Sequence, residues 1–128
     1  MANIHVLTNS RNECVLKCYI TSPSGGNCYI NLASTILKSD ETFNRDNAIV
    51  TIRALYWGTK NNKNIDVSRV ITYANNELHG HYYLVNSGVH DFVGFVDDVY
   101  SNKDILIQGD GEYHVIIKLA KTAGYTTS

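Results

Sequence analysis

The chain has 128 residues, a formal net charge of -1, and 44% hydrophobic against 18% charged residues. A chain of this length fits one domain that buries its own core without metals or disulfides, and this composition excludes a disordered protein. Its 11 basic residues are scattered among 12 acidic ones, which argues against a nucleic acid partner.

The first residues, MANIHVLTNSRNE, lack a charged start followed by an apolar run, and no apolar run approaches the ~18 residues of a membrane-spanning helix. We therefore expect a protein that is made in a cytoplasm and enters no membrane. The three cysteines are an odd number in a chain without an export signal, so we interpret them as reduced, buried thiols. Cys14 and Cys18 would lie about 13 Å apart on a strand, too far to share a zinc ion.

Strands joined by asparagine turns are predicted from the abundance of asparagine, isoleucine and tyrosine and the single proline. Cys14 to Ile20 alternates as a strand, and the turn-forming residues SPSGGN follow it. A second short apolar run extends from Cys28 to Leu32. These two runs predict a hairpin.

A second hairpin is predicted around the loop from Gly58 to Asn64, whose asparagines tolerate left-handed backbone angles. The strand before the loop runs from Ala48 to Trp57 with a period of two. This period assigns Val50, Ile52, Ala54 and Tyr56 to one face, and Thr51, Arg53, Leu55 and Trp57 to the other. The return strand carries Ile65, Val67 and Ile71.

A further strand is predicted from Leu78 to Val85. Its alternation assigns Leu78, Tyr82 and Leu84 to one face, and His79, His81, Tyr83 and Val85 to the other. The residues VNSGVHD are interpreted as a loop, and Asp91 to Tyr100 as either one helical turn or an irregular loop.

A last hairpin is predicted where Asp104 to Gln108 and Glu112 to Leu119 flank the residues GDG. The side chains of the second strand that should point one way are Tyr113, Val115, Ile117 and Leu119. Seven or eight short strands with regular turns and no long amphipathic helix predict a single antiparallel β-sandwich spanning residues 1–128. A jelly-roll-like arrangement and a closed barrel are the alternatives that the same pattern allows.

The histidines raise the hypothesis of a metal-dependent enzyme, because His79 and His81 form an HxH pair. His90 and His114 could supply further ligands, but no spacing signature joins them to the pair. We interpret the histidines as loop or solvent-facing residues and expect no metal or other cofactor.

Catalytic motifs are absent from the sequence, which contains no GxSxG, P-loop, HExxH or GxGxxG. Asp97 and Asp98 form an acidic pair that we interpret as solvated charge in a loop. The GDGE segment lacks the alternating oxygen ligands of a calcium loop, and a turn explains its glycines. We therefore expect binding or a structural role rather than catalysis.

Tyr56 and Trp57 are the strongest candidates for recognition, because a flat side chain at a strand end can stack on a sugar or anchor a protein partner. The alternative is that Trp57 closes one end of the core, with its N–H bonded to water or a carbonyl. We favour this structural role for Trp57.

Several segments together resemble small β-rich virion proteins of tailed phages, especially those that infect marine cyanobacteria. The resemblance lies in IRALYWGTKNNKNIDVSRVI, in LHGHYYLV and in DILIQGDGEYHVIIKLAK, and it covers the C-terminal two thirds of the chain. The first pattern ends an aromatic strand in a small-residue corner at Tyr56, Trp57, Gly58 and Thr59. The later patterns match Leu78, Gly80 and Tyr82, and then Asp104, Ile105, Leu106, Gly109, Tyr113, Ile117, Lys118 and Lys121.

The resemblance implies a non-enzymatic virion structural protein. Its expected role is a capsid decoration or cement protein that binds the major capsid protein or other virion proteins in a symmetric lattice, or as a homo-oligomer. A neck or tail component is a variant of this role. A carbohydrate-binding module is the main alternative, and it would display Trp57 with Tyr56 and Tyr82 as a platform.

Overall fold

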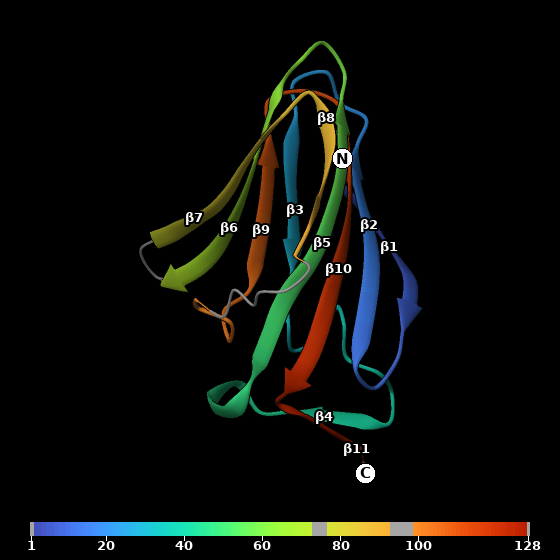
Figure 1. Cartoon of the computed structure of the whole chain (residues 1–128), viewed down its shortest axis with the longest axis vertical. Coiled ribbons are helices and arrows are strands. Elements are labelled where there is room, and N and C mark those ends of the chain that lie inside the picture. Colours follow the sequence, from blue (N-terminus) through green and yellow to red (C-terminus); the bar gives the residue numbers. More distant parts are fainter. Residues whose placement is uncertain (1, 73–76, 93–98, 128) are drawn as a thin grey trace.

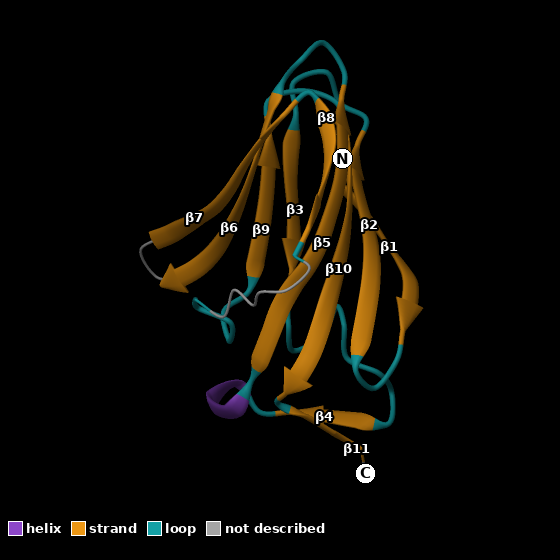
Figure 2. Cartoon of the chain, in the orientation of Figure 1, coloured by secondary structure: helices purple, strands orange, loops and turns teal. Residues whose placement is uncertain are grey.

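The computed structural model describes residues 2–72, 77–92 and 99–127, which form two antiparallel sheets packed face to face (Figures 1 and 2). The five-stranded sheet has the order β1 (Ala2–Asn9), β2 (Glu13–Ile20), β10 (Tyr113–Ala123), β5 (Ile49–Thr59) and β8 (Ser87–Asp91). The four-stranded sheet has the order β3 (Gly26–Ile30), β9 (Ile105–Gly109), β6 (Asn64–Thr72) and β7 (Glu77–Val85). The predicted all-β, antiparallel sandwich is confirmed.

Two short strands, β4 (Glu41–Phe43) and β11 (Tyr125–Thr127), pair across one end of the sandwich, beside a single 3-10 turn, η1 (Arg45–Asn47). At the opposite end, uppermost in Figure 1, four connections carry the chain between the sheets. They join β2 to β3, β5 to β6, β7 to β8, and β9 to β10. If the edge strand β1 is set aside, each sheet has four strands, in the orders β2-β10-β5-β8 and β3-β9-β6-β7. These are the strand orders of a jelly roll.

The three predicted hairpins are wrong, although their turns lie where the sequence places them. Each turn connects two strands of different sheets, so the strands that it joins are not paired. The left-handed backbone conformation predicted for the loop asparagines is confirmed, because Asn61 and Asn62 have φ values of 64° and 55°. Asn86, in the connection between β7 and β8, has a φ of 58°. A tight turn reverses the chain in either case, and the sheet that buries the next strand decides its partner.

A β-bulge at Arg53 overturns the predicted alternation along β5. Lys118 of β10 faces Ala54, but the next residue, Leu119, faces Ile52, so Arg53 is the extra residue. Beyond the bulge the faces exchange: Leu55 is fully buried and Tyr56 is 40% exposed. Alternation alone cannot locate such an insertion.

A second bulge disturbs β7, where Val67 of β6 faces Tyr82 and Ser68 faces Gly80. The predicted common face of Leu78 and Leu84 is therefore interrupted: Leu84 is buried, whereas Leu78 is 36% exposed. The predicted loop VNSGVHD is also wrong, because only Asn86 turns and the following residues form β8 along β5. The ambiguous segment from Asp91 to Tyr100 falls mostly on residues 93–98, which lie outside the described residues.

One hydrophobic core fills the space between the sheets. The predicted inward row of β10 is confirmed: Val115, Ile117 and Leu119 are fully buried and Tyr113 is 5% exposed. The three cysteines are free thiols in this core, as predicted. The other buried members of the cluster are Leu16, Ile20, Ile30, Leu32, Ile36, Val50, Ile52, Leu55, Ile65, Val67, Leu84, Phe92, Ile105 and Ile107.

A buried ion pair holds three segments together at the end of the sandwich where β4 lies. The Lys121 ammonium donates to the Glu41 carboxylate at 2.8 Å, to the Asn9 side-chain oxygen at 3.1 Å and to the Ser10 carbonyl at 3.2 Å. Both charged side chains are almost fully buried, at 0% and 2% exposed. These bonds link β10 to β4 and to the β1–β2 turn.

Candidate functional site

The outer face of the five-stranded sheet, which points away from the core, carries polar and aromatic side chains that strand pairing aligns. We define it by three rows of side chains that cross the strands. The first row contains Tyr19, His114 and Gly58; the second contains Lys17, Ile116, Tyr56 and Val89; the third contains Val15, Lys118, Ala54 and Asp91.

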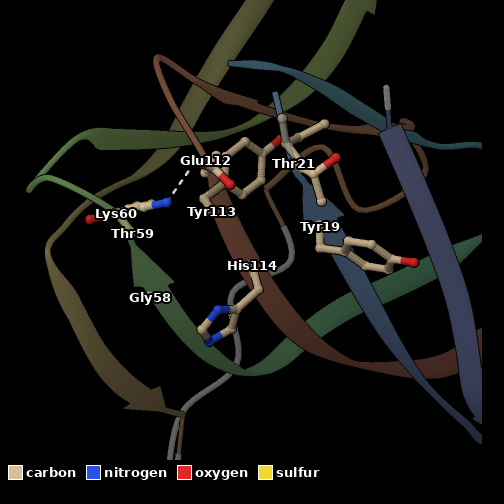
Figure 3. A pocket seen from close by; sticks show the side chains of 9 residues that line it. Tyr19, Thr21, Gly58, Thr59, Lys60, Glu112, Tyr113 and His114 are labelled. Carbon is tan, nitrogen blue, oxygen red and sulfur yellow. Dashed lines mark ion pairs between the residues drawn. The ribbon is translucent and has the colours of Figure 1, made fainter. Parts of the chain in front are cut away.

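The first row borders a hollow of about 390 Å³ at the crossover end of the sheet, which we call the Gly58 hollow (Figure 3). A Cβ added to Gly58 would lie 2.5 Å from Cε1 of His114, so the imidazole lies over the space that the glycine leaves. Lys60 and Glu112 form an exposed ion pair of 3.2 Å at the rim. The other lining residues are Tyr19, Ile20, Thr21, Thr59 and Tyr113.

A second hollow, of about 300 Å³, lies on the same face beyond Tyr56, and we call it the Arg53 hollow. The bulge creates it, because Arg53 and Ala54 both lie opposite Lys118, and the small Ala54 leaves space beside the Arg53 side chain. Its lining residues are Glu13, Arg53, Ala54, Tyr56, Asp91, Phe92 and Lys118.

The charged groups of the Arg53 hollow are only partly paired. Lys118 and Glu13 form an ion pair of 3.4 Å with side chains 42% and 45% exposed. Within the described part of the chain, neither the Arg53 guanidinium nor the Asp91 carboxylate has a hydrogen-bond or ion-pair partner. The hollow therefore presents a free donor and a free acceptor, without net charge, beside the exposed Tyr56 ring.

The three residues predicted for binding do not come together. Tyr56 lies on the outer face, whereas its neighbour Trp57 points the other way and packs, half-buried, against the core. The indole N–H of Trp57 donates to the Val85 carbonyl at 3.0 Å, as its structural interpretation predicted. Tyr82 lies in the other sheet and contacts Phe92, with ring centroids 5.3 Å apart.

An exposed apolar edge forms a second candidate surface, where β7 and β8 end their respective sheets. Three side chains define this β7–β8 edge: Tyr83, 73% exposed, Val85, 55% exposed, and Val89, 62% exposed. They are the most exposed large hydrophobic residues of the described chain. Tyr83 and Val85 point outward from the four-stranded sheet, because Leu84 between them is buried. Val89 points outward from the five-stranded sheet and lies directly opposite Tyr56.

The histidines are dispersed. His90 stacks on Phe92 with centroids 4.3 Å apart, and His79 lies against Tyr100 at 5.0 Å. The side chain of His81 lies outside the described residues, as do Asp97 and Asp98. Among the residues that are described, no group of three or more histidine, cysteine, aspartate or glutamate side chains could hold a metal ion.

Two of the three buried thiols, Cys14 and Cys18, have an environment that suppresses their chemistry. Burial raises the pKa of Cys14 to about 11, although the nearby Lys121 ammonium opposes this shift. The hydrogen bond with Cys28, together with burial, raises the pKa of Cys18. The same hydrogen bond lowers the pKa of Cys28 to about 7, but this side chain is fully buried and out of reach of solvent. The three cysteines therefore serve as core residues.

Comparison of the chain with protein-family models, curated proteins and solved structures finds no match. Within the described residues, no helix has the length and apolar character needed to cross a bilayer.

Sequence reasoning identified Tyr56 but missed Arg53 and Asp91. Alternation predicts Arg53 on the face opposite Tyr56, and turn-forming residues predict a loop at Asp91, because the bulge and strand β8 leave no local signal. The charged residues at Glu13 and Lys118 come from distant parts of the chain and meet only through the β2–β10 pairing.

Proposed function

We propose that this chain is a structural protein of a phage particle, and that it acts as a capsid decoration protein binding neighbouring capsid subunits. The resemblance of the central and C-terminal strands to virion proteins supports this role. The jelly-roll strand order supports it by analogy, since this architecture occurs in viral capsid proteins as well as in lectins.

The observation that carries the proposal is the β7–β8 edge. Tyr83, Val85 and Val89 expose apolar surface on β7 and β8, which are edge strands of their sheets. Exposed apolar side chains at sheet edges are typical of sites where another chain binds, because edge strands otherwise favour charge or cover. A neighbouring subunit that covers this edge removes it from water.

A decoration protein of this kind stabilises a shell by mass action. It binds the assembled lattice and not the free capsid subunits, so binding shifts the equilibrium toward the assembled state. Many identical weak contacts repeated by symmetry then replace a deep pocket.

The first test is quantitative mass spectrometry of purified particles, comparing the copy number of this chain with that of the major shell protein. Copies comparable to the shell protein are expected for a decoration protein. A few copies would place it in the neck or tail and contradict the decoration role. Absence from the particle would contradict the whole proposal.

The second test asks whether the β7–β8 edge makes the contact. The double variant Val85→Ser and Val89→Ser should bind particles at least about tenfold more weakly, because each valine contributes roughly 1 kcal/mol when covered. The matched control is Leu7→Ser, which changes a 50% exposed apolar residue on β1, at the other end of the five-stranded sheet. Equal losses in the two variants would show that the β7–β8 edge is not the specific contact.

A further inference from the structure

We infer that the outer face of the five-stranded sheet binds a neutral oligosaccharide, with Tyr56 as the stacking platform between the Gly58 and Arg53 hollows. This activity goes beyond the proposed virion contact at the β7–β8 edge: both hollows lie outside that edge, and the two surfaces share only Val89, which lies beside Tyr56.

Tyr56 lies between the two hollows along β5. It is two residues from Gly58, in one hollow, and two from Ala54, in the other, and these two residues are about 13 Å apart along the strand. The ring is 40% exposed and flanked by Ile116 and Val89 on the neighbouring strands. An extended ligand that lies along β5 would therefore contact both hollows and the aromatic ring together.

The polar groups of the Arg53 hollow select the class of ligand. Arg53 offers a fork of N–H donors and Asp91 a carboxylate acceptor, and neither has a partner in the described chain. A sugar hydroxyl both donates and accepts hydrogen bonds, so adjacent hydroxyls can satisfy both groups. The apolar faces of sugar rings suit stacking on Tyr56.

The charge balance favours a neutral ligand. Arg53 and Lys118 are matched by Asp91 and Glu13, so the hollow has no net charge. An acidic saccharide would be attracted by Arg53 and repelled by Asp91, so its charge would bring no net gain in a hollow without net charge.

The Gly58 hollow extends the site toward the crossover end. His114 is exposed, and Thr21 and Thr59 line the hollow with hydroxyl groups. Hydroxyl and imidazole groups both donate and accept hydrogen bonds, so a second sugar unit can bind there. An oligosaccharide should therefore bind more tightly than the corresponding monosaccharide.

The test is a titration followed by amide chemical shifts in the intact protein. The probes are four neutral hexasaccharides, built from α-glucose, β-glucose, mannose and N-acetylglucosamine, together with hexagalacturonate and the four monosaccharides. We expect at least one neutral hexasaccharide to shift the amides of residues 53–58 and of Ile116, with an affinity about tenfold above that of its monosaccharide. A site that holds a single sugar unit would instead bind the hexasaccharide and its monosaccharide with equal affinity. That result would contradict the inferred extended site.

Two variants and one control connect the binding to named groups. Tyr56→Ala should weaken the best hexasaccharide by about tenfold, and the isosteric Asp91→Asn by about fivefold. Tyr83→Ala removes a more exposed tyrosine from the other sheet and should leave binding unchanged. The inference is overturned by the absence of shifts with every neutral hexasaccharide at about 10 mM, by tighter binding of hexagalacturonate, or by an equal loss in Tyr83→Ala.

Discussion

Breaking the Glu41–Lys121 ion pair should destabilise the protein more than any change to a surface ion pair. The Lys121 side chain is fully buried and its ammonium makes three hydrogen bonds, of which the shortest, 2.8 Å, goes to Glu41. The ring of Tyr125 also lies 4.6 Å from the Lys121 nitrogen. Little water can replace a lost partner in this environment.

The magnitude follows from the burial of both charges. Glu41→Gln leaves a buried ammonium without its counter-charge, which costs roughly 3–5 kcal/mol of unfolding free energy. Lys121→Met should cost a similar amount, because it leaves the Glu41 carboxylate buried with one donor among the described residues, the Lys38 backbone N–H at 2.9 Å. The double variant removes both charges, so its cost should be about 3 kcal/mol less than the sum of the single costs.

Urea unfolding at neutral pH measures these free energies, provided that the slope of the unfolding free energy against urea is the same in all variants. The control is Glu13→Gln, which breaks the half-exposed pair with Lys118 and should cost less than about 1 kcal/mol. Additive costs for Glu41→Gln and Lys121→Met would refute the reasoning, since they would mean that the two charges do not interact.

The same pair predicts a pH dependence. Burial by itself raises the pKa of the Glu41 carboxyl, but the bond from Lys121 and the backbone N–H of Lys38 outweigh it and hold the pKa below the ordinary value of 4.5. A carboxyl whose pKa is lower in the folded state stabilises the fold above its unfolded pKa and loses this effect as pH falls through the folded pKa. The stability difference between the natural chain and Glu41→Gln should therefore shrink below pH 4.5.

Three further predictions concern the core. Leu55→Ala should lower the unfolding free energy by about 2–5 kcal/mol, because Leu55 is fully buried. Tyr56→Ala should lower it by less than about 1 kcal/mol, because Tyr56 lies on the outer face. A larger loss for Tyr56→Ala than for Leu55→Ala would contradict the bulge at Arg53. Trp57→Ala should cost about 2–3 kcal/mol in urea unfolding, because the half-buried indole packs on the core and bonds to a carbonyl; an unchanged midpoint would mean that the ring is displayed. The three cysteines should resist a thiol reagent in the folded protein and react on unfolding, and rapid labelling of a native thiol would disagree with their burial.

Local chemistry made part of this structure predictable. The alternation of β10 identified its inward row, because every second residue of a strand meets the same face. The asparagine-rich loop was placed correctly, since Asn61 and Asn62 adopt left-handed angles that few other residues tolerate. The buried thiols and the structural role of Trp57 also followed from residue type.

The sequence by itself therefore determined the all-β class, the positions of most strands and the turns between them. The tertiary structure decided which strands pair, because a turn fixes the reversal of the chain but not the sheet into which the next strand packs. It also decided which side chains form the candidate site. One extra residue at Arg53 exchanges the faces of β5, and the pairing of β2, β10, β5 and β8 assembles Glu13, Lys118 and Asp91 around Tyr56. These contacts join residues far apart in the chain, so no local pattern encodes them.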